Sequence, residues 1–234
     1  MRYRTILFDL GDTLIQVPRP GPTYQRLLER HGYEFDLPEL EAALQLARCR
    51  QDEQCPDWRF DDLRLDAAAC AARRQIHVET IVEMARPHDR ATLTEALYAL
   101  YVNTELFTLF PDVAPTLRQL ASEGYRLGIV SNWEPRLREL CAAHDIDEFF
   151  DFVVISEVEG YTKPHPYLYQ RALELAGESP QAVVHVGDKL VEDVNGAIAL
   201  GITAVLLDRS GALDCTHQPR IRSLSELPRV LACD

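Results

Sequence analysis

The sequence predicts an α/β fold, in which a parallel sheet is covered by helices on both faces and a bundle of helices is inserted into the chain. Residues 5–9 form a short apolar run that is typical of a buried strand. After Pro111, strand-like runs that are apolar on both faces alternate with helical patterns, as in covered parallel sheets. We therefore divide the chain into a core of residues 1–15 and 111–234 and an insert of residues 16–110.

The insert, residues 16–110, is predicted to contain four helices, because its apolar residues recur at helical spacing. Pro38 suits the first turn of the second helix, and Asp89 can cap the fourth. Gly32 ends the first helix and Pro87 ends the third. We find no strand pattern in this block, which is therefore predicted to be a helical bundle of its own. The four helices are expected at residues 23–32, 37–51, 60–85 and 89–106.

The rest of the core alternates between helical patterns and short apolar runs. This alternation is typical of strand–helix–strand units that build a parallel sheet. Helices are expected at residues 112–124, 134–145, 165–177 and 190–201, and strands at residues 125–132, 150–156, 182–188 and 203–208.

Polar side chains stand at the ends of three predicted strands. The first strand ends in Asp9, a second in Ser131 and Asn132, and a third in Asp188. Ligands of open parallel sheets bind beyond the carboxyl ends of the strands. We therefore expect these side chains, which are far apart in the sequence, to meet at one site.

The residue types at these ends indicate phosphoryl transfer. Two carboxylates held close together, such as Asp9 and Asp188, repel each other unless a cation lies between them, and Mg²⁺ prefers oxygen ligands of this kind. Ser131 and nearby backbone N–H groups could hold phosphate oxygens. Lys163 lies in a loop that Pro164 stiffens. A carboxylate, a hydroxyl, a lysine and a second carboxylate are the components of a site with an aspartyl nucleophile.

Four short segments, in this order, resemble the motifs of the haloacid dehalogenase superfamily of hydrolases. They are FDLGDTL, IVSN, the lysine of GYTKPHP, and VGDKLVEDVNGA. The resemblance is to phosphatase-like members that carry a helical cap after the first strand. It implies a Rossmann-like parallel-sheet core and a cap, formed by the insert, that closes over the site.

By this resemblance, Asp9 is the nucleophile that takes the phosphoryl group. Ser131, with Asn132 beside it, binds the substrate by hydrogen-bonding the phosphoryl group. Lys163 neutralises charge and orients Asp9. The expected reaction hydrolyses a small phosphate monoester through an aspartyl-phosphate intermediate.

The resemblance also implies a Mg²⁺ cofactor. Its ligands would be Asp9, Asp188 and the backbone carbonyl of Gly11, with Asp193 as a direct or indirect partner. Glycine keeps this carbonyl, so the metal site does not require another residue at position 11.

Gly11 departs from the D-x-D pattern of the family's phosphatases, in which the second acid protonates the leaving group and then activates water. Losing this acid removes a contribution of roughly 10²–10⁴ in rate. Asp12 is the nearest replacement, and we include it among the candidate catalytic residues.

Three interpretations stay open because of Gly11. The first is a phosphatase that tolerates the missing acid. The second is a 2-haloacid dehalogenase, which attacks carbon without a metal; Asp188 and Asp193 argue against it. The third is a weakly active or inactive protein that binds a metabolite or a partner; the presence of Asp9 and Lys163 argues against it.

The resemblance implies a small phosphorylated metabolite as the partner, and the composition argues against nucleic acid and membranes. Lys and Arg number 24 and Asp and Glu 37, so the formal charge of −13 would repel nucleic acid, and no basic run offsets it. No run of about 18 apolar residues predicts a membrane span. No signal peptide is recognisable, and the six cysteines are scattered, which together indicate a cytoplasmic location.

Overall fold

The computed structural model describes residues 2–55 and 64–232, which fall into two compact units. The core unit contains the described residues 2–16, 64 and 108–232. The helical unit contains residues 17–55 and 65–107. Each unit is described by itself.

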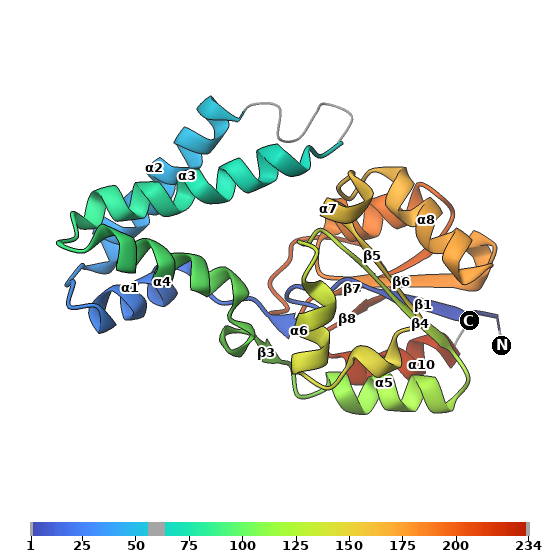
Figure 1. Cartoon of the computed structure of the whole chain (residues 1–234). Coiled ribbons are helices and arrows are strands. Elements are labelled where there is room, and N and C mark those ends of the chain that lie inside the picture. Colours follow the sequence, from blue (N-terminus) through green and yellow to red (C-terminus); the bar gives the residue numbers. More distant parts are fainter. Residues whose placement is uncertain (1, 56–63, 233–234) are drawn as a thin grey trace. The chain divides into compact units, whose positions relative to one another are not determined.

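The core unit is built on a six-stranded sheet in which every neighbouring pair of strands is parallel. The strand order is β5-β4-β1-β6-β7-β8, so the first strand of the chain lies in the middle (Figure 1). This arrangement confirms the predicted fold class. The strands are β1 (Thr5–Phe8), β4 (Arg126–Ser131), β5 (Phe152–Ile155), β6 (Val183–Gly187), β7 (Thr203–Leu207) and β8 (Arg220–Ile221).

Helices cover both faces of this sheet (Figure 1). On one face, α8 (Pro166–Ala176) packs on β4 and β5, and α9 (Gly196–Ile198) packs on β7. The other face carries α5 (Val113–Ser122), α6 (Leu137–Ala143) and α10 (Leu227–Ala232). Short 3₁₀ turns complete the core at Asp147–Phe149, Pro180–Ala182 and Leu224–Glu226.

The register of the sheet brings three strand ends together. Phe8 of β1 pairs with Ile129 of β4 on one side and with Val186 of β6 on the other. The residue after Phe8 is Asp9, whose N–H donates to the carbonyl of Val186 at 2.9 Å. The ends of β4 and β6 therefore flank Asp9, as the predicted site requires.

The helical unit contains α1 (Pro20–Arg30), α2 (Leu37–Gln54), α3 (Ala67–Ala85) and α4 (Arg90–Val102). Each of the last three begins with an aspartate whose carboxylate accepts a backbone N–H of the first turn: Asp36, Asp66 and Asp89. The prediction that Asp89 caps the N-terminus of the fourth helix is thus confirmed. Leucine and valine side chains, such as Leu40 and Val78, fill the space between these helices.

Several predicted helix bounds were wrong for local reasons. The first helix begins at Pro20, because proline fits a first turn. The third begins only at Ala67, after its cap, and the predicted residues 60–63 lie outside the described residues. The fourth ends at Val102, because the Asn103 side chain caps a separate 3₁₀ turn at Thr104–Leu106.

The prediction that residues 16–110 lack strands was also wrong. Ile15–Gln16 (β2) pairs antiparallel with Thr108–Leu109 (β3), at the points where the chain leaves and re-enters the core. Two-residue strands are too short to leave an alternating pattern in the sequence. The same applies to β8, and the single-turn helix α7 (Ser156–Glu159) was missed too.

The helix predicted at residues 190–201 is interrupted. Leu190–Asn195 forms a π-helix, the segment η5, and α9 follows directly. Among the helices of residues 2–55 and 64–232, none combines the length and the apolar character that crossing a bilayer needs.

We expect Gly128→Ala to destabilise the core by about 1–3 kcal/mol, because a Cβ at Gly128 would lie 2.5 Å from the ring of Phe152 on β5. Urea denaturation checks this. In a Phe152→Leu background, where the overlapping ring atoms are gone, the same substitution should cost less. Equal costs in the two backgrounds would contradict this account.

Candidate active site

A buried lysine joins two aspartates at the carboxyl end of the sheet. The Lys163 ammonium lies 2.6 Å from Oδ1 of Asp9 and 2.5 Å from Oδ1 of Asp193. All three side chains are almost entirely shielded from water, with 1% of Lys163, 7% of Asp9 and 1% of Asp193 exposed. A loop, a strand end and the π-helix thus meet at one cation.

The Asp9 carboxylate receives two hydroxyl groups as well as the ammonium. Ser131, the last residue of β4, donates to Oδ1 at 3.0 Å. Thr13, in the turn after β1, donates to Oδ2 at 3.4 Å. Oδ2 therefore has one long hydrogen bond and is the less engaged of the two oxygens.

Burial and the shared lysine set the charges of this cluster. Burial raises the pKa of Asp9, and the charge of Lys163 opposes the rise. Burial also disfavours ionisation of Asp193, but Lys163 and a hydrogen bond from His185 together hold its pKa below the usual range. Burial alone would lower the pKa of Lys163, yet the two carboxylates raise it. At neutral pH, Lys163 is therefore a cation beside an ionised Asp193.

Asp193 has hydrogen-bond donors on both oxygens. His185 Nε2 lies 3.3 Å from Oδ1, and the N–H of Lys189 donates to Oδ2 at 2.9 Å. Burial lowers the pKa of His185, so its ring is neutral and donates through Nε2 to the carboxylate. Gly187 makes room for this packing, because a Cβ there would overlap the Asp193 carboxyl group. These contacts favour a role for Asp193 in holding Lys163 over a role as a direct metal ligand.

Asp188 differs from Asp193, because its Oδ1 is buried and has no hydrogen-bond partner. Burial, with the nearby charges of Asp9 and Asp193, raises its pKa to about 7. Carboxylate oxygens of Asp9, Asp188 and Asp193 lie within 4.8 Å of one another. An orphaned carboxylate oxygen among oxygen donors and surplus negative charge fits a hard divalent cation.

Asn132 uses its side chain to hold Lys163. Its amide oxygen accepts the N–H of Lys163 at 2.7 Å, and its amide nitrogen donates to the Lys163 carbonyl at 3.2 Å. The same nitrogen lies 3.2 Å from a carboxylate oxygen of Glu192 on the π-helix. These contacts position the lysine loop, and the role of Asn132 in binding substrate stays a prediction.

Gly11 and Asp12 occupy the turn after β1. Gly11 forms a bridge with Ile15, and Asp12 has a left-handed backbone with φ 57° and donates its N–H to Ile15. Asp12 is exposed and lies close enough to Asp188 to raise the pKa of that carboxyl group further. The structure thus brings Asp12 to the Asp188 side of the site.

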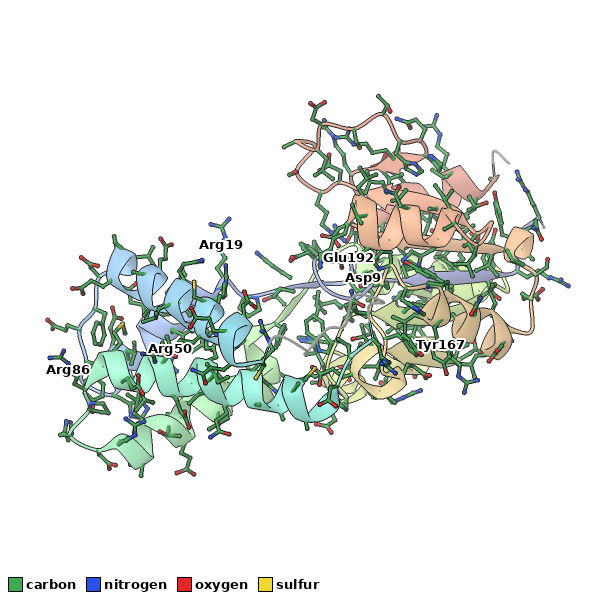
Figure 2. All side chains as sticks on the ribbon, turned by 90° about the horizontal axis from the view of Figure 1, so that it is seen from above. Asp9, Arg19, Arg50, Arg86, Tyr167 and Glu192 are labelled. Atoms are coloured by element: carbon green, nitrogen blue, oxygen red, sulfur yellow. The ribbon has the colours of Figure 1, made fainter. Side chains whose placement is uncertain are left out.

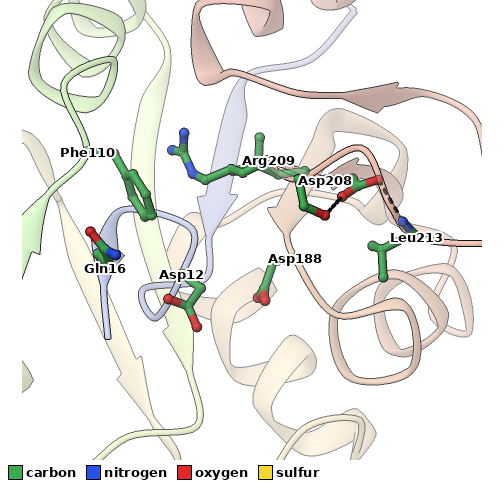
Figure 3. Close-up of a pocket in the computed structure, with 9 residues that line it drawn as sticks. Asp12, Gln16, Phe110, Asp188, Asp208, Arg209 and Leu213 are labelled. Atoms are coloured by element: carbon green, nitrogen blue, oxygen red, sulfur yellow. Dashed lines mark hydrogen bonds between the residues drawn. The ribbon is translucent and has the colours of Figure 1, made fainter. Parts of the chain in front are cut away.

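A pocket of about 300 Å³ opens beside Asp12 and Asp188 (Figure 3). Its arginine, Arg209, is engaged elsewhere: it donates to both oxygens of Asp112 at 3.0 Å and to the Thr13 carbonyl at 2.7 Å. The guanidinium also lies over the ring of Phe110, 3.8 Å from its centroid. Arg209 therefore braces the turn after β1, and its charge is matched by Asp112.

The sequence did not reveal His185 or Arg209 as parts of this site. His185 belongs to none of the four motifs, although strand alternation puts it on the same face as Gly187, where Asp193 packs. Arg209 follows the strand next to β6 and carries no motif. Its position after a strand end was the available signal.

A parallel sheet with a lysine-bridged acidic cluster at the carboxyl ends of its strands places this chain among the α/β proteins with a Rossmann-like sheet. The model of the haloacid dehalogenase-like hydrolase family matches residues 3–201, and the chain belongs to this family.

The relatives that we compare cover most of the chain. Haloacid dehalogenase-like hydrolase domain-containing protein 3 of Danio rerio is 30% identical, over 96% of this chain and 95% of its own. Glyceraldehyde 3-phosphate phosphatase of Methanopyrus kandleri is 31% identical, over 88% of this chain and 84% of its own. Among solved structures, 2-haloacid dehalogenase from Pseudomonas syringae pv. Tomato superposes with a TM-score of 0.71 and 28% identity, covering 99% of both chains.

Without a divalent cation, raising the pH should destabilise the protein through Asp188. Its pKa is about 7 when folded, against about 3.9 when unfolded, so the folded state holds the proton more tightly. Stability from this group is present below about pH 4 and is lost as the pH rises through about 7.

Calorimetry in chelator checks this with Asp188→Asn, which should raise Tm relative to wild type more at pH 8 than at pH 5. Adding Mg²⁺ at pH 8 should stabilise the wild type and not the variant. The exposed Asp214, changed to Asn, is the matched control. A difference between wild type and Asp188→Asn that is independent of pH would refute the account.

Proposed function

We propose that this protein is a Mg²⁺-dependent hydrolase of small phosphate monoesters that acts in the cytoplasm through an aspartyl-phosphate on Asp9. The observation that carries the proposal is the excess of buried carboxylates over cations. One lysine serves Asp9 and Asp193, and Asp188 keeps a buried oxygen without a partner. A carboxylate that attacks carbon needs no such excess, whereas phosphoryl transfer uses a divalent cation to offset the charge of the phosphate.

Asp9 and Asp188 would hold the Mg²⁺ with the Gly11 carbonyl, and Asp193 would act through Lys163. Bound Mg²⁺ supplies positive charge that stabilises the oxygens of the transferring group. We propose Asp9 and Asp188, and not Asp193, as direct carboxylate ligands of the metal. The reason is that the Asp193 carboxylate already binds Lys163, His185 and the Lys189 N–H.

The reaction then has two steps. A carboxylate oxygen of Asp9 attacks phosphorus, the bond to the ester oxygen breaks, and the alcohol leaves with a proton. Water next attacks the phosphorus of the aspartyl-phosphate, which releases phosphate and restores Asp9. Lys163 and Ser131, which contact Asp9, would stabilise the charge of the phosphoryl oxygens.

Asp12 is our candidate for the acid that protonates the leaving group. Gly11 has no side chain to do so, and Asp12 is the exposed carboxyl group of the same turn. We propose that residues 16–110 serve as the cap that selects the substrate. The relative named glyceraldehyde 3-phosphate phosphatase makes three-carbon phosphates the first substrates to test.

Two other functions remain to be separated by experiment. The similarity to a 2-haloacid dehalogenase and the missing acid at Gly11 favour testing carbon attack. The missing acid also favours a binding protein without turnover. Haloacid turnover in chelator would identify the first, and Mg²⁺ binding without release from any ester would identify the second.

We expect phosphate release from a panel of sugar phosphates, nucleotides, glyceraldehyde 3-phosphate and p-nitrophenyl phosphate. Release should require Mg²⁺, stop in chelator, and vanish in Asp9→Asn, because the amide is not a nucleophile. Circular dichroism should find Asp9→Asn folded. Retained activity in the folded variant would rule out Asp9 as the nucleophile.

Gly11→Asp should raise kcat, by up to roughly 10²-fold, if the missing acid limits the rate. The backbone permits the change, because Gly11 is not among the glycines with positive φ. Steady-state kinetics on the best substrate measures this. An unchanged rate, together with a large loss in Asp12→Ala, would instead assign the proton transfer to Asp12.

A further inference from the structure

A buried tyrosine supports the segment that carries Asp193. Tyr169 lies on α8, six residues after Lys163, and its side chain is fully buried. Its hydroxyl donates to the Glu192 carbonyl at 2.7 Å and lies 3.3 Å from the Asp193 carbonyl. Both carbonyls belong to the π-helix Leu190–Asn195.

A π-helix benefits from such an external donor. Its wider turn is a strained arrangement that is frequent at functional sites, and buried carbonyl groups need hydrogen-bond partners. Burial raises the pKa of the Tyr169 hydroxyl, which therefore stays protonated and able to donate.

The Tyr169 ring is held in place by its neighbours. Its plane is nearly perpendicular to that of His185, with ring centroids 5.2 Å apart. Gly196, the first residue after the π-helix, allows the close approach, because a Cβ there would lie 2.8 Å from the ring and 3.1 Å from Pro164. The ring therefore contacts the histidine that binds Asp193 and lies beside the loop that carries Lys163.

The contacts of Tyr169 and those of Asn132 both lead to the ion pair of Lys163 and Asp193. Tyr169 holds the backbone of Glu192 and Asp193, while Asn132 holds the side chain of Glu192 and the backbone of Lys163. The two segments held in this way carry the partners of the 2.5 Å contact between Lys163 and Asp193.

We propose that Tyr169 is a positioning residue: its hydroxyl fixes the π-helix so that Asp193 holds the Lys163 ammonium against Asp9. This inference rests on the proposed phosphatase activity, in which Lys163 stabilises the transferring group. Tyr169 is buried and has no contact with solvent, so it affects the reaction without touching the substrate.

Tyr169→Phe, which removes only the hydroxyl, tests the proposal. The matched control is Tyr167→Phe on the same helix, since Tyr167 is 37% exposed and its hydroxyl has no hydrogen-bond partner among the described residues (Figure 2). We expect kcat on the best phosphate ester to fall about tenfold in Tyr169→Phe with KM unchanged, because only the transition-state contact of Lys163 is weakened. The control should match the wild type.

Amide hydrogen exchange gives a second readout that needs no turnover. Exchange in residues 189–199 should accelerate in Tyr169→Phe and not in Tyr167→Phe. Accelerated exchange with a lower kcat supports the proposal. Unchanged exchange, unchanged kcat, or a rise in KM that accounts for the whole effect would overturn it. A wild type without turnover would refute the proposed function instead, and exchange alone would then decide whether Tyr169 fixes the segment.

Discussion

The ion bridge from Lys163 to Asp9 and Asp193 is the constraint around which the core unit is arranged. A charged group shielded from water is tolerated only when it is paired and its remaining hydrogen-bonding capacity is met, and removing one partner of such a pair typically costs about 3–5 kcal/mol. The surrounding contacts follow from that requirement. Ser131, His185 and the Lys189 N–H supply the additional hydrogen bonds.

Secondary structure supplies the precision that this bridge needs. Asp9 is fixed by strand pairing on both sides of β1. Lys163 lies in a loop, where no strand pairing fixes the backbone. The Asn132 side chain instead hydrogen-bonds both the N–H and the carbonyl group of Lys163. Asp193 is carried by a helix with a widened turn. The backbones of these three residues are therefore held in three ways: by strand pairing, by a side-chain amide and by a π-helix.

The sequence predicted the parallel sheet and the meeting of Asp9, Ser131 and Asp188, because strand ends follow from local apolar runs and all lie at one edge. It did not predict the contacts of His185, Tyr169 or Arg209. The partners of Tyr169 and Arg209 are distant along the chain, and a histidine or tyrosine inside an apolar run is typical of packing. The π-helix was missed because one additional residue in a turn leaves the helical pattern nearly intact. The strands β2 and β3 are too short for any periodicity.

The pairing of β2 with β3 also bears on how such a chain diversifies. Ile15 faces Leu109 and Gln16 faces Thr108, so the polypeptide departs from the core and returns at neighbouring points. The segment between β2 and β3 therefore begins and ends at neighbouring points of the core. The entropic cost of closing such a loop grows only slowly with the length of the segment. This segment is therefore a module that evolution can lengthen, shorten or exchange, while the strand registers around Asp9 stay as they are.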